Sequence, residues 1–233
     1  MYPCSQIKNS YDFSEGIKII YEELYSIYGP QNWWPGDSRI EIIIGAILTQ
    51  AVSWQNVEKA INNLKEEDLL NIKKLEQIKN DYLAELIKPS GYYNMKAKKL
   101  KSFINFTKEN YNLSLDDLAK GKPKQKREEL LEIYGIGPET ADSILLYAFD
   151  KPEFVIDTYT KRILSRIGYV DENIQYKTLK NKIENNLKKD SKLYNEYHAL
   201  LVKLAKEHCL KSSPLCEKCP LNNTDKEERY VNS

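Results

Sequence analysis

The spacing of apolar residues constrains the fold of this chain more than any other feature. Ile17, Ile20 and Leu24 show the three-to-four-residue spacing of a helix, and the same spacing continues through most of the sequence. No segment alternates apolar and polar residues over the length of a strand. The run from Ile42 to Leu48 is apolar on all sides and should form the most buried helix. The sequence therefore predicts an all-α fold.

Glycine and proline divide this helical pattern into segments. The clearest breaks fall at residues 29–30, 89–91 and 120–123. Helices are expected over residues 11–28, 39–64 with an interruption near 53, 66–71, 74–78, 82–87, 93–110, 124–134, 138–149, 158–167, 175–187 and 192–206.

Composition argues against a membrane or secreted protein. Of the 233 residues, 41% are hydrophobic and 11% aromatic, which is enough for a packed core. The longest apolar run is far too short to cross a bilayer, and the first residues lack a basic stretch followed by an apolar one. A cytoplasmic location is therefore expected.

Charge gives little information about partners by itself. The chain has 35 Lys and Arg against 34 Asp and Glu, for a formal net charge of +1. Phosphates would therefore be bound by local lysine clusters and backbone amides, because the surface cannot be uniformly basic.

One segment joins two helical patterns through Gly135-Ile136-Gly137-Pro138. Both glycines permit positive φ and close approach of the backbone, and proline suits the first turn of the following helix. Such a turn directs N–H groups toward one point that can hold a phosphate. An ordinary helix–turn–helix corner would show the same glycines. The longer string, Leu-x-x-Ile-x-Gly-Ile-Gly-x-x-Thr-Ala-Asp-x-Ile-Leu over residues 130–145, is much more specific.

This string resembles the helix–hairpin–helix DNA glycosylase superfamily, the group that contains endonuclease III. Residues 155–162, Val-Ile-Asp-Thr-Tyr-Thr-Lys-Arg, are similar to the family's Val-Asp-Thr-His-x-x-Arg pattern. The resemblance implies that Asp157 is catalytic, stabilising positive charge on the deoxyribose and orienting or deprotonating the attacking water. The alternative is that Asp157 only caps the helix that begins at Thr158. Residues that the resemblance places against DNA are Gln50, Gly135, Ile136, Gly137 and Thr140.

In bifunctional members of the family, a lysine in the second hairpin helix attacks the sugar as a Schiff-base nucleophile. Glu139 occupies the matching position here, and a glutamate cannot form an imine. The resemblance therefore implies a monofunctional glycosylase that leaves an abasic site. Lys161 could replace that nucleophile in principle, but no pattern favours it.

The three tryptophans of the chain, Trp33, Trp34 and Trp54, lie close together in the sequence. Core packing is the ordinary interpretation of such aromatics. A second interpretation is a stacking pocket for a base flipped out of the duplex, with Gln50 filling the gap that the base leaves. The sequence by itself leaves both open.

Three further segments are similar to the bacterial 3-methyladenine DNA glycosylase III branch of the superfamily. They are Trp-Trp-Pro at residues 33–35, Gly-Ala-Ile-Leu-Thr-Gln at 45–50 and Pro-Ser-Gly-Tyr-Tyr-Asn-Met-Lys-Ala-Lys at 89–98. The resemblance implies that Trp34 and Trp54 sandwich the damaged base, with Trp33 and Glu139 also at the pocket. N-alkylated adenine carries positive charge, which electron-rich rings attract.

Three of the four cysteines crowd into a short segment near the C-terminal end. Cys209, Cys216 and Cys219 follow the first part of the Cys-x6-Cys-x2-Cys-x5-Cys spacing that holds a [4Fe–4S] cluster in endonuclease III, and Asp225 takes the fourth place. Three outcomes stay open: a cluster with Asp225 or Cys4 as last ligand, a zinc site that uses His208, or a loop without metal. The 3-methyladenine branch lacks the cluster, so the chain combines two patterns.

By analogy with the family, a six-helix domain with the hairpin covers residues 31–151, and a second helical domain joins 1–30 to 152–233. A monomer is expected that docks damaged double-stranded DNA between these domains and releases an alkylated purine such as 3-methyladenine. The rival interpretations are a glycosylase for uracil, mismatched thymine or an oxidised base, and a hairpin module that binds DNA without catalysis.

Overall fold

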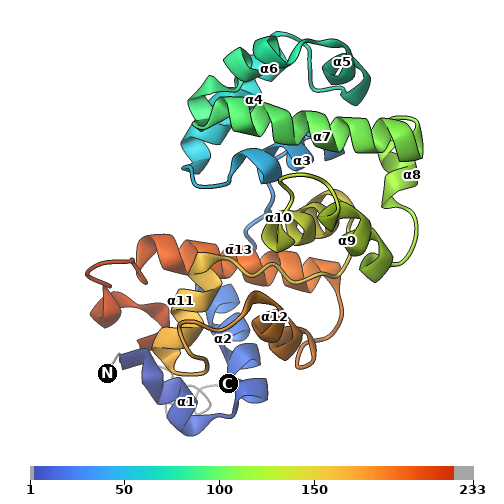
Figure 1. The fold of residues 1–233 in the computed structure, drawn as a ribbon. Coiled ribbons are helices and arrows are strands. Elements are labelled where there is room, and N and C mark those ends of the chain that lie inside the picture. The colour runs from blue at the N-terminus through green and yellow to red at the C-terminus, as the bar shows by residue number, and fades with distance from the viewer. Residues whose placement is uncertain (1–2, 223–233) are drawn as a thin grey trace. The chain divides into compact units, whose positions relative to one another are not determined.

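The structure, a computed structural model, describes residues 3–222 and confirms the all-α fold (Figure 1). No β-strand occurs among these residues. The chain divides into two compact units, one made of Met1–Trp33 with Phe154–Ser233 and the other of Trp34–Glu153. Across residues 3–222, no helix combines the length and the apolar character that crossing a membrane requires.

The first unit packs around its longest helix, α13 (Ser191–Glu207), against which α2 (Phe13–Tyr28) and α11 (Thr158–Ile167) lie (Figure 1). Two tyrosines of α13 are almost completely buried, and the hydroxyl of Tyr197 donates to the carbonyl of Ile17 at 2.6 Å. This bond satisfies a polar group that burial would otherwise penalise. The other elements are α1 (Gln6–Ser10), α12 (Tyr176–Glu184) and the short turns η1 (Pro3–Ser5), η4 (Cys216–Lys218) and η5 (Pro220–Asn222).

The second unit packs around α3 (Arg39–Leu48), the helix predicted to be most buried. Its N-cap Ser38 accepts a hydrogen bond from the Glu41 amide, and Ile43, Ile47 and Leu48 are 0% exposed. α3 packs against α4 (Trp54–Glu66), α7 (Tyr93–Tyr111) and the π-helical turn η3 (Ile144–Ala148). The remaining elements are α5 (Ile72–Gln77), α6 (Asn80–Leu86), η2 (Lys88–Ser90), α8 (Leu115–Ala119), α9 (Pro123–Leu131) and α10 (Pro138–Ser143).

The structure confirms one predicted break and corrects one predicted helix. The interruption expected near Ser53 separates α3 from α4, and Ala51 there has a φ of +56°. The helix predicted over residues 66–71 is wrong. Glu66 ends α4, Asp68 has a φ of +52°, and Asn71 is already the N-cap of α5. A left-handed residue stops helical hydrogen bonding, which is why this segment forms a turn.

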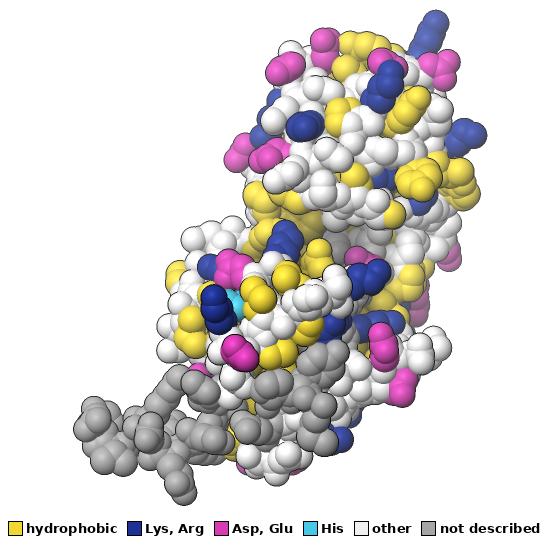
Figure 2. Space-filling view, turned by 90° about the vertical axis from the view of Figure 1, so that its left-hand side faces the viewer, with side chains coloured by type: hydrophobic (Ala, Val, Ile, Leu, Met, Phe, Trp, Pro, Cys, Tyr) yellow, Lys and Arg dark blue, Asp and Glu magenta, His cyan; other side chains and the backbone are white. Residues whose placement is uncertain are grey.

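Charged side chains of both signs alternate on the surface. On the face shown in Figure 2, Lys and Arg stand among Asp and Glu without a large region of one sign. This agrees with the formal net charge of +1.

Candidate functional site

The hairpin connects α9 to α10 through a turn that needs only one of its two glycines for conformation. Gly135 has a φ of +83°, and a Cβ there would meet the side chain of Lys99 at 2.2 Å. Gly137 departs from the prediction of positive φ: its φ is −90°, and nothing lies within 4 Å of an added Cβ. Gly137 is instead the extended N-cap residue of α10, and Pro138 follows it in the first turn.

The hairpin buries two of its side chains and leaves the backbone of its turn exposed. Ile136 and Thr140 are buried, whereas Gly137 and Pro138 are exposed. The Ile136 amide donates to the Ile133 carbonyl at 3.1 Å, so Ile136 anchors the turn. The first amides of α10 are therefore the groups best placed to receive a phosphate.

A buried ion pair joins the two helices of the hairpin. Arg127 Nε donates to Asp142 Oδ1 at 2.7 Å, and its Nη2 donates to Oδ2 at 3.2 Å. Asp142 is 0% exposed, so its charge is compensated by this guanidinium fork instead of by bulk water. The pair fixes α9 and α10 on either side of the turn.

Gln50, predicted to fill the gap in the duplex, is attached to the hairpin. Its Nε2 donates to the Gly135 carbonyl at 3.1 Å and to Thr140 Oγ1 at 3.0 Å. Lys99, whose stem crosses Gly135, donates to Gln50 Oε1. The structure thus brings three of the five predicted DNA residues into one hydrogen-bonded group.

Lys96, from the Pro-Ser-Gly-Tyr-Tyr-Asn-Met-Lys motif, binds the end of α3 next to Gln50. It is 2% exposed and donates to the carbonyls of Leu48 at 2.8 Å and Ser90 at 2.5 Å. Burial and the nearby Lys99 ammonium lower the pKa of Lys96 to about 8. The motif therefore holds the end of α3, just before Gln50.

The predicted base pocket is an aromatic cluster. Trp34 and Trp54, both half-buried, meet edge to face with ring centroids 5.1 Å apart and an interplanar angle of 89°. Tyr147 from the π-helical turn lies against Trp34 at 4.9 Å and 36°. Gly45 allows both indoles to approach α3, because an added Cβ would stand 3.3 Å from Trp34 and 3.5 Å from Trp54.

The edge-to-face geometry of Trp34 and Trp54 differs from the parallel geometry that the predicted sandwich requires. A base held between two rings needs them parallel and about 7 Å apart, twice the stacking distance set by carbon–carbon contact. Trp34 and Trp54 are perpendicular and touch, so a base would stack on the cluster or push the rings apart. Trp33 belongs to the other unit, where Lys206 Nζ lies 5.9 Å from its ring centroid. Glu139 is exposed in the first turn of α10.

Asp157 uses its two carboxylate oxygens for different partners. Oδ1 accepts a hydrogen bond from the Thr160 amide at 2.7 Å, which caps α11. Oδ2 lies 3.5 Å from Nε2 of His198 on α13. The side chains are 12% and 6% exposed, so the pair lies close beneath the surface.

These partners keep Asp157 ionised. Burial raises the pKa of a carboxyl group, but the His198 imidazole and the hydrogen bonds from Thr160 outweigh it and hold the pKa of Asp157 below its usual range. This ionised carboxylate stabilises the fold above the unfolded pKa of about 3.9. The contribution is lost as the pH falls through the lower, folded pKa.

The cysteine loop closes on the other end of the chain. Cys4 in η1 joins Cys209, Cys216 and Cys219 around one cavity, and all four are free thiols. Burial raises the pKa of Cys4 to about 12, and the other three cysteines raise it further. Arg166, His208 and Pro214 complete the lining.

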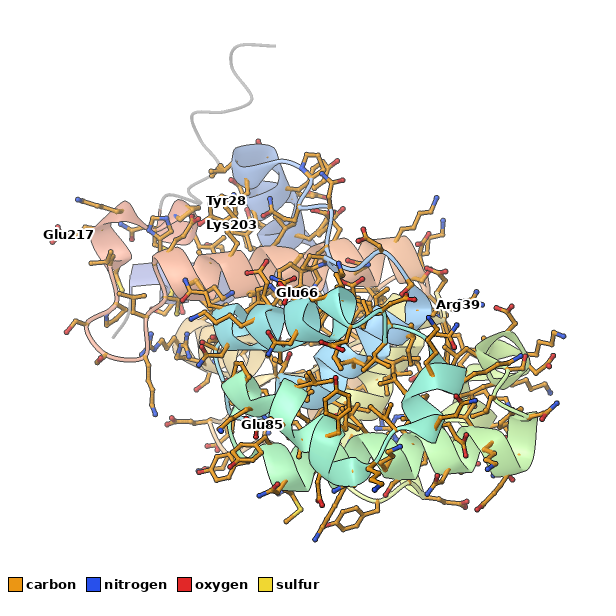
Figure 3. All side chains as sticks on the ribbon, turned by 90° about the horizontal axis from the view of Figure 1, so that it is seen from above. Tyr28, Arg39, Glu66, Glu85, Lys203 and Glu217 are labelled. Atoms are coloured by element: carbon orange, nitrogen blue, oxygen red, sulfur yellow. The ribbon has the colours of Figure 1, made fainter. Side chains whose placement is uncertain are left out.

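Positive groups hold this loop in place. Arg166 Nη1 donates to the Leu210 carbonyl at 2.6 Å and contacts Cys209 Sγ at 3.3 Å. Arg162 Nε donates to the Cys209 carbonyl at 2.8 Å. Lys203 Nζ lies 4.6 Å from the ring centroid of Tyr28, whose ring stacks with that of His208, and Figure 3 labels Tyr28 and Lys203.

The four cysteines around this cavity are donors that a [4Fe–4S] cluster could use. Among residues 3–222, no three His, Cys, Asp or Glu side chains are grouped to hold one metal ion, as the zinc alternative would require. In a [4Fe–4S] cluster each thiolate binds its own iron, so the four sulfurs stand farther apart around a shared cavity. Nδ1 of His208 is buried and has no hydrogen-bond partner in the described part of the chain, as expected of a donor toward cluster sulfur. Asp225 lies outside the described residues.

Comparison with known families shows the family to which the chain belongs. Residues 44–189 match the family of HhH-GPD superfamily base excision DNA repair proteins. The chain belongs to this superfamily. A Methanocaldococcus jannaschii protein named as a DNA repair glycosylase is 51% identical over 209 residues, covering 89% of this chain and 94% of its own length.

Solved HhH-GPD structures share the fold. The Helicobacter pylori 3-methyladenine DNA glycosylase bound to 1,N6-ethenoadenine is 30% identical, with a TM-score of 0.71 over 84% of this chain and 98% of that one. A non-covalent endonuclease III–DNA complex is 19% identical, with a TM-score of 0.77 over 91% and 94% of the two chains. The chain is therefore a DNA glycosylase of base excision repair.

Two residues of this HhH-GPD site could not be identified from motifs. His198 lies in an amphipathic helix without a recognisable pattern, and only the fold brings it to Asp157. Lys99 was one of several lysines in its segment, and only its contact with Gln50 distinguishes it. For His198, the only signal in the sequence was a histidine on the buried face of a predicted helix.

Proposed function

We propose that this glycosylase releases alkylated purines, 3-methyladenine in particular, by hydrolysis. The carrying observation is the cluster of Trp34, Trp54 and Tyr147 against α3, in the same unit as the hairpin turn. Electron-rich rings attract a base that carries positive charge and tolerate its added methyl group. The 30% identity to a 3-methyladenine glycosylase supports the same substrate class.

Asp157 supplies the chemistry in this proposal. Breaking the glycosidic bond builds positive charge on the deoxyribose, and a fixed carboxylate stabilises that charge. The Thr160 amide fixes one oxygen, which leaves Oδ2, the oxygen facing His198, to orient or deprotonate water. An alkylated purine is already a good leaving group, so modest catalysis is sufficient.

Hydrolysis without strand cleavage follows from Glu139. Its carboxylate stands exposed in the first turn of α10, at the position where bifunctional relatives carry the nucleophilic lysine. A carboxylate cannot form the imine that strand cleavage requires. The product is therefore an intact strand with an abasic site.

The test is base release from methylated duplex DNA, with products identified by mass, beside duplexes that contain uracil or a thymine mismatch. Release of 3-methyladenine with intact strands is expected. Release of uracil or thymine alone would overturn the substrate assignment. A product trapped by borohydride would show an imine and would overturn the hydrolytic mechanism.

Replacing Trp54 with alanine should reduce the release of 3-methyladenine by about 10- to 100-fold, because stacking contributes about 1–3 kcal/mol per base. Single-turnover rates on methylated duplex measure the effect. Tyr82→Ala is the control, since this tyrosine of α6 is exposed and its hydroxyl donates to Glu67, outside the aromatic cluster. Equal rates for Trp54→Ala and the control would exclude the aromatic cluster as the base site.

Replacing His198 with glutamine removes the imidazole beside Asp157 but keeps a hydrogen-bonding side chain. Because His198 lowers the pKa of Asp157, the acid limb of the pH profile should move to higher pH while the plateau rate changes little. Circular dichroism at each pH separates this shift from unfolding. Asp190→Asn, which alters the N-cap of the same helix, should leave the limb in place. An unmoved limb in His198→Gln would refute the coupling.

The cysteine loop is assigned a [4Fe–4S] cluster held by Cys209, Cys216 and Cys219 with one further ligand. Such a cluster, when bound, supplies rigidity and local charge and takes no part in base release. The loop carbonyls bonded to Arg162 and Arg166 would keep the thiolates in position for it.

A further inference from the structure

We propose that Cys4, from the opposite end of the chain, is the fourth ligand of the cluster. The assignment rests on the cluster proposed above. The segment after Cys219 places Asp225 where the family spacing has its last cysteine, and a carboxylate is a harder, weaker ligand for iron than a thiolate. A replacement thiolate is therefore needed, and the fold supplies one.

Cys4 reaches the loop because its turn is packed there. The turn η1 contacts both η4, which begins at Cys216, and η5, which begins directly after Cys219. η1 also contacts α11, the helix that carries Arg162 and Arg166. The thiol of Cys4 lines the same cavity as the other three thiols, and it forms no disulfide with them.

The charges around the cavity suit an anionic cluster. Four thiolates give a [4Fe–4S]²⁺ core a net negative charge, which needs compensation in a partly buried site. Arg166 contacts Cys209 Sγ directly, and the unpartnered Nδ1 of His208 lies in the same lining within the described residues. Both groups can donate to sulfur, as outer-shell groups of metal sites do.

This ligand would give the cluster a structural task. Ligation by Cys4 ties residues at the start of the chain to a loop more than two hundred positions later, within one folding unit. Metal binding then stabilises this unit directly, because the ligands cannot meet in the unfolded chain.

The test is iron content and electron paramagnetic resonance after anaerobic reconstitution of the full chain with iron and sulfide. Native protein should bind about four irons, and Cys4→Ser should bind about three, with the oxidised [3Fe–4S] signal of a cluster that has lost one corner. Asp225→Asn is the matched control and should retain about four. A Cys4→Ser protein with native iron content and spectrum would overturn the assignment while leaving the cluster itself intact.

Two further measurements protect the test against a variant that does not fold. In native reconstituted protein, iodoacetamide should spare all four cysteines, and alkylation of Cys4 alone would refute its ligation. In a Cys4→Ser background, Asp225→Cys restores the family spacing and should return the iron content to about four. If native protein takes up no iron at all, the cluster proposal fails, and the ligand assignment fails with it.

Discussion

Replacing Asp157 with asparagine is expected to slow base release by about 10²- to 10⁴-fold, the range associated with a positioned acid–base or charge-stabilising group. Asparagine keeps the shape of the side chain and can still accept the hydrogen bond from Thr160. It cannot carry the negative charge that stabilises the deoxyribose cation or accept a proton from water. The loss should therefore appear in the single-turnover rate, with duplex binding largely preserved.

The matched control is Asp12→Asn. Asp12 caps α2 by accepting a hydrogen bond from the Glu15 amide at 2.9 Å, as Asp157 caps α11. If capping were the only role of Asp157, the two variants would behave alike, with near-native rates and small changes in melting temperature. An Asp157→Asn enzyme with the native rate would return Asp157 to a structural role and revive a hairpin module that binds DNA without catalysis.

Local patterns in the sequence were sufficient for the helices and the hairpin. The spacing of Ile17, Ile20 and Leu24 predicts the buried face of α2, and all three are buried. The string around Gly135 predicts the turn, because a backbone position with positive φ favours glycine and Gly135 adopts such a φ. These features depend on neighbours within a few residues, which is why they could be read from the chain.

Contacts between distant segments were not accessible in the same way. His198 meets Asp157 from a position 41 residues later, and Cys4 meets Cys209 across most of the chain. Nothing local specifies such partners, because they depend on how helices pack. The sequence could name Cys4 as one alternative ligand, and only the fold shows that Cys4 lines the same cavity as the other three cysteines.

The orientation of the aromatic rings also could not be predicted from the sequence. The sequence indicated that Trp34 and Trp54 lie together, but Gly45 and the π-helical turn decide that their rings meet edge to face. Tyr147, which lies within the π-helical turn, also packs against Trp34. Ring geometry follows from such packing details, and composition does not determine it.

Replacing Arg127 with methionine is expected to lower the free energy of unfolding by about 3–5 kcal/mol, because it removes the guanidinium that is bonded to the buried Asp142 carboxylate. Asp142 is 0% exposed and is bonded by two guanidinium nitrogens, so water cannot take over this role without disturbing the hairpin. Chemical denaturation followed by circular dichroism measures the change. Because the pair joins α9 to α10, duplex affinity should fall together with stability.

The control is an ion pair whose two side chains are exposed to solvent. Lys120 and Asp117 are 2.6 Å apart but are 76% and 53% exposed, so Lys120→Met should change stability by less than about 1 kcal/mol. Adding Asp142→Leu to Arg127→Met removes the buried carboxylate as well and should recover most of the lost stability. If Arg127→Met were as mild as Lys120→Met, the hairpin would be held by its apolar contacts alone, with Ile136 and Leu130 as its anchors in the core.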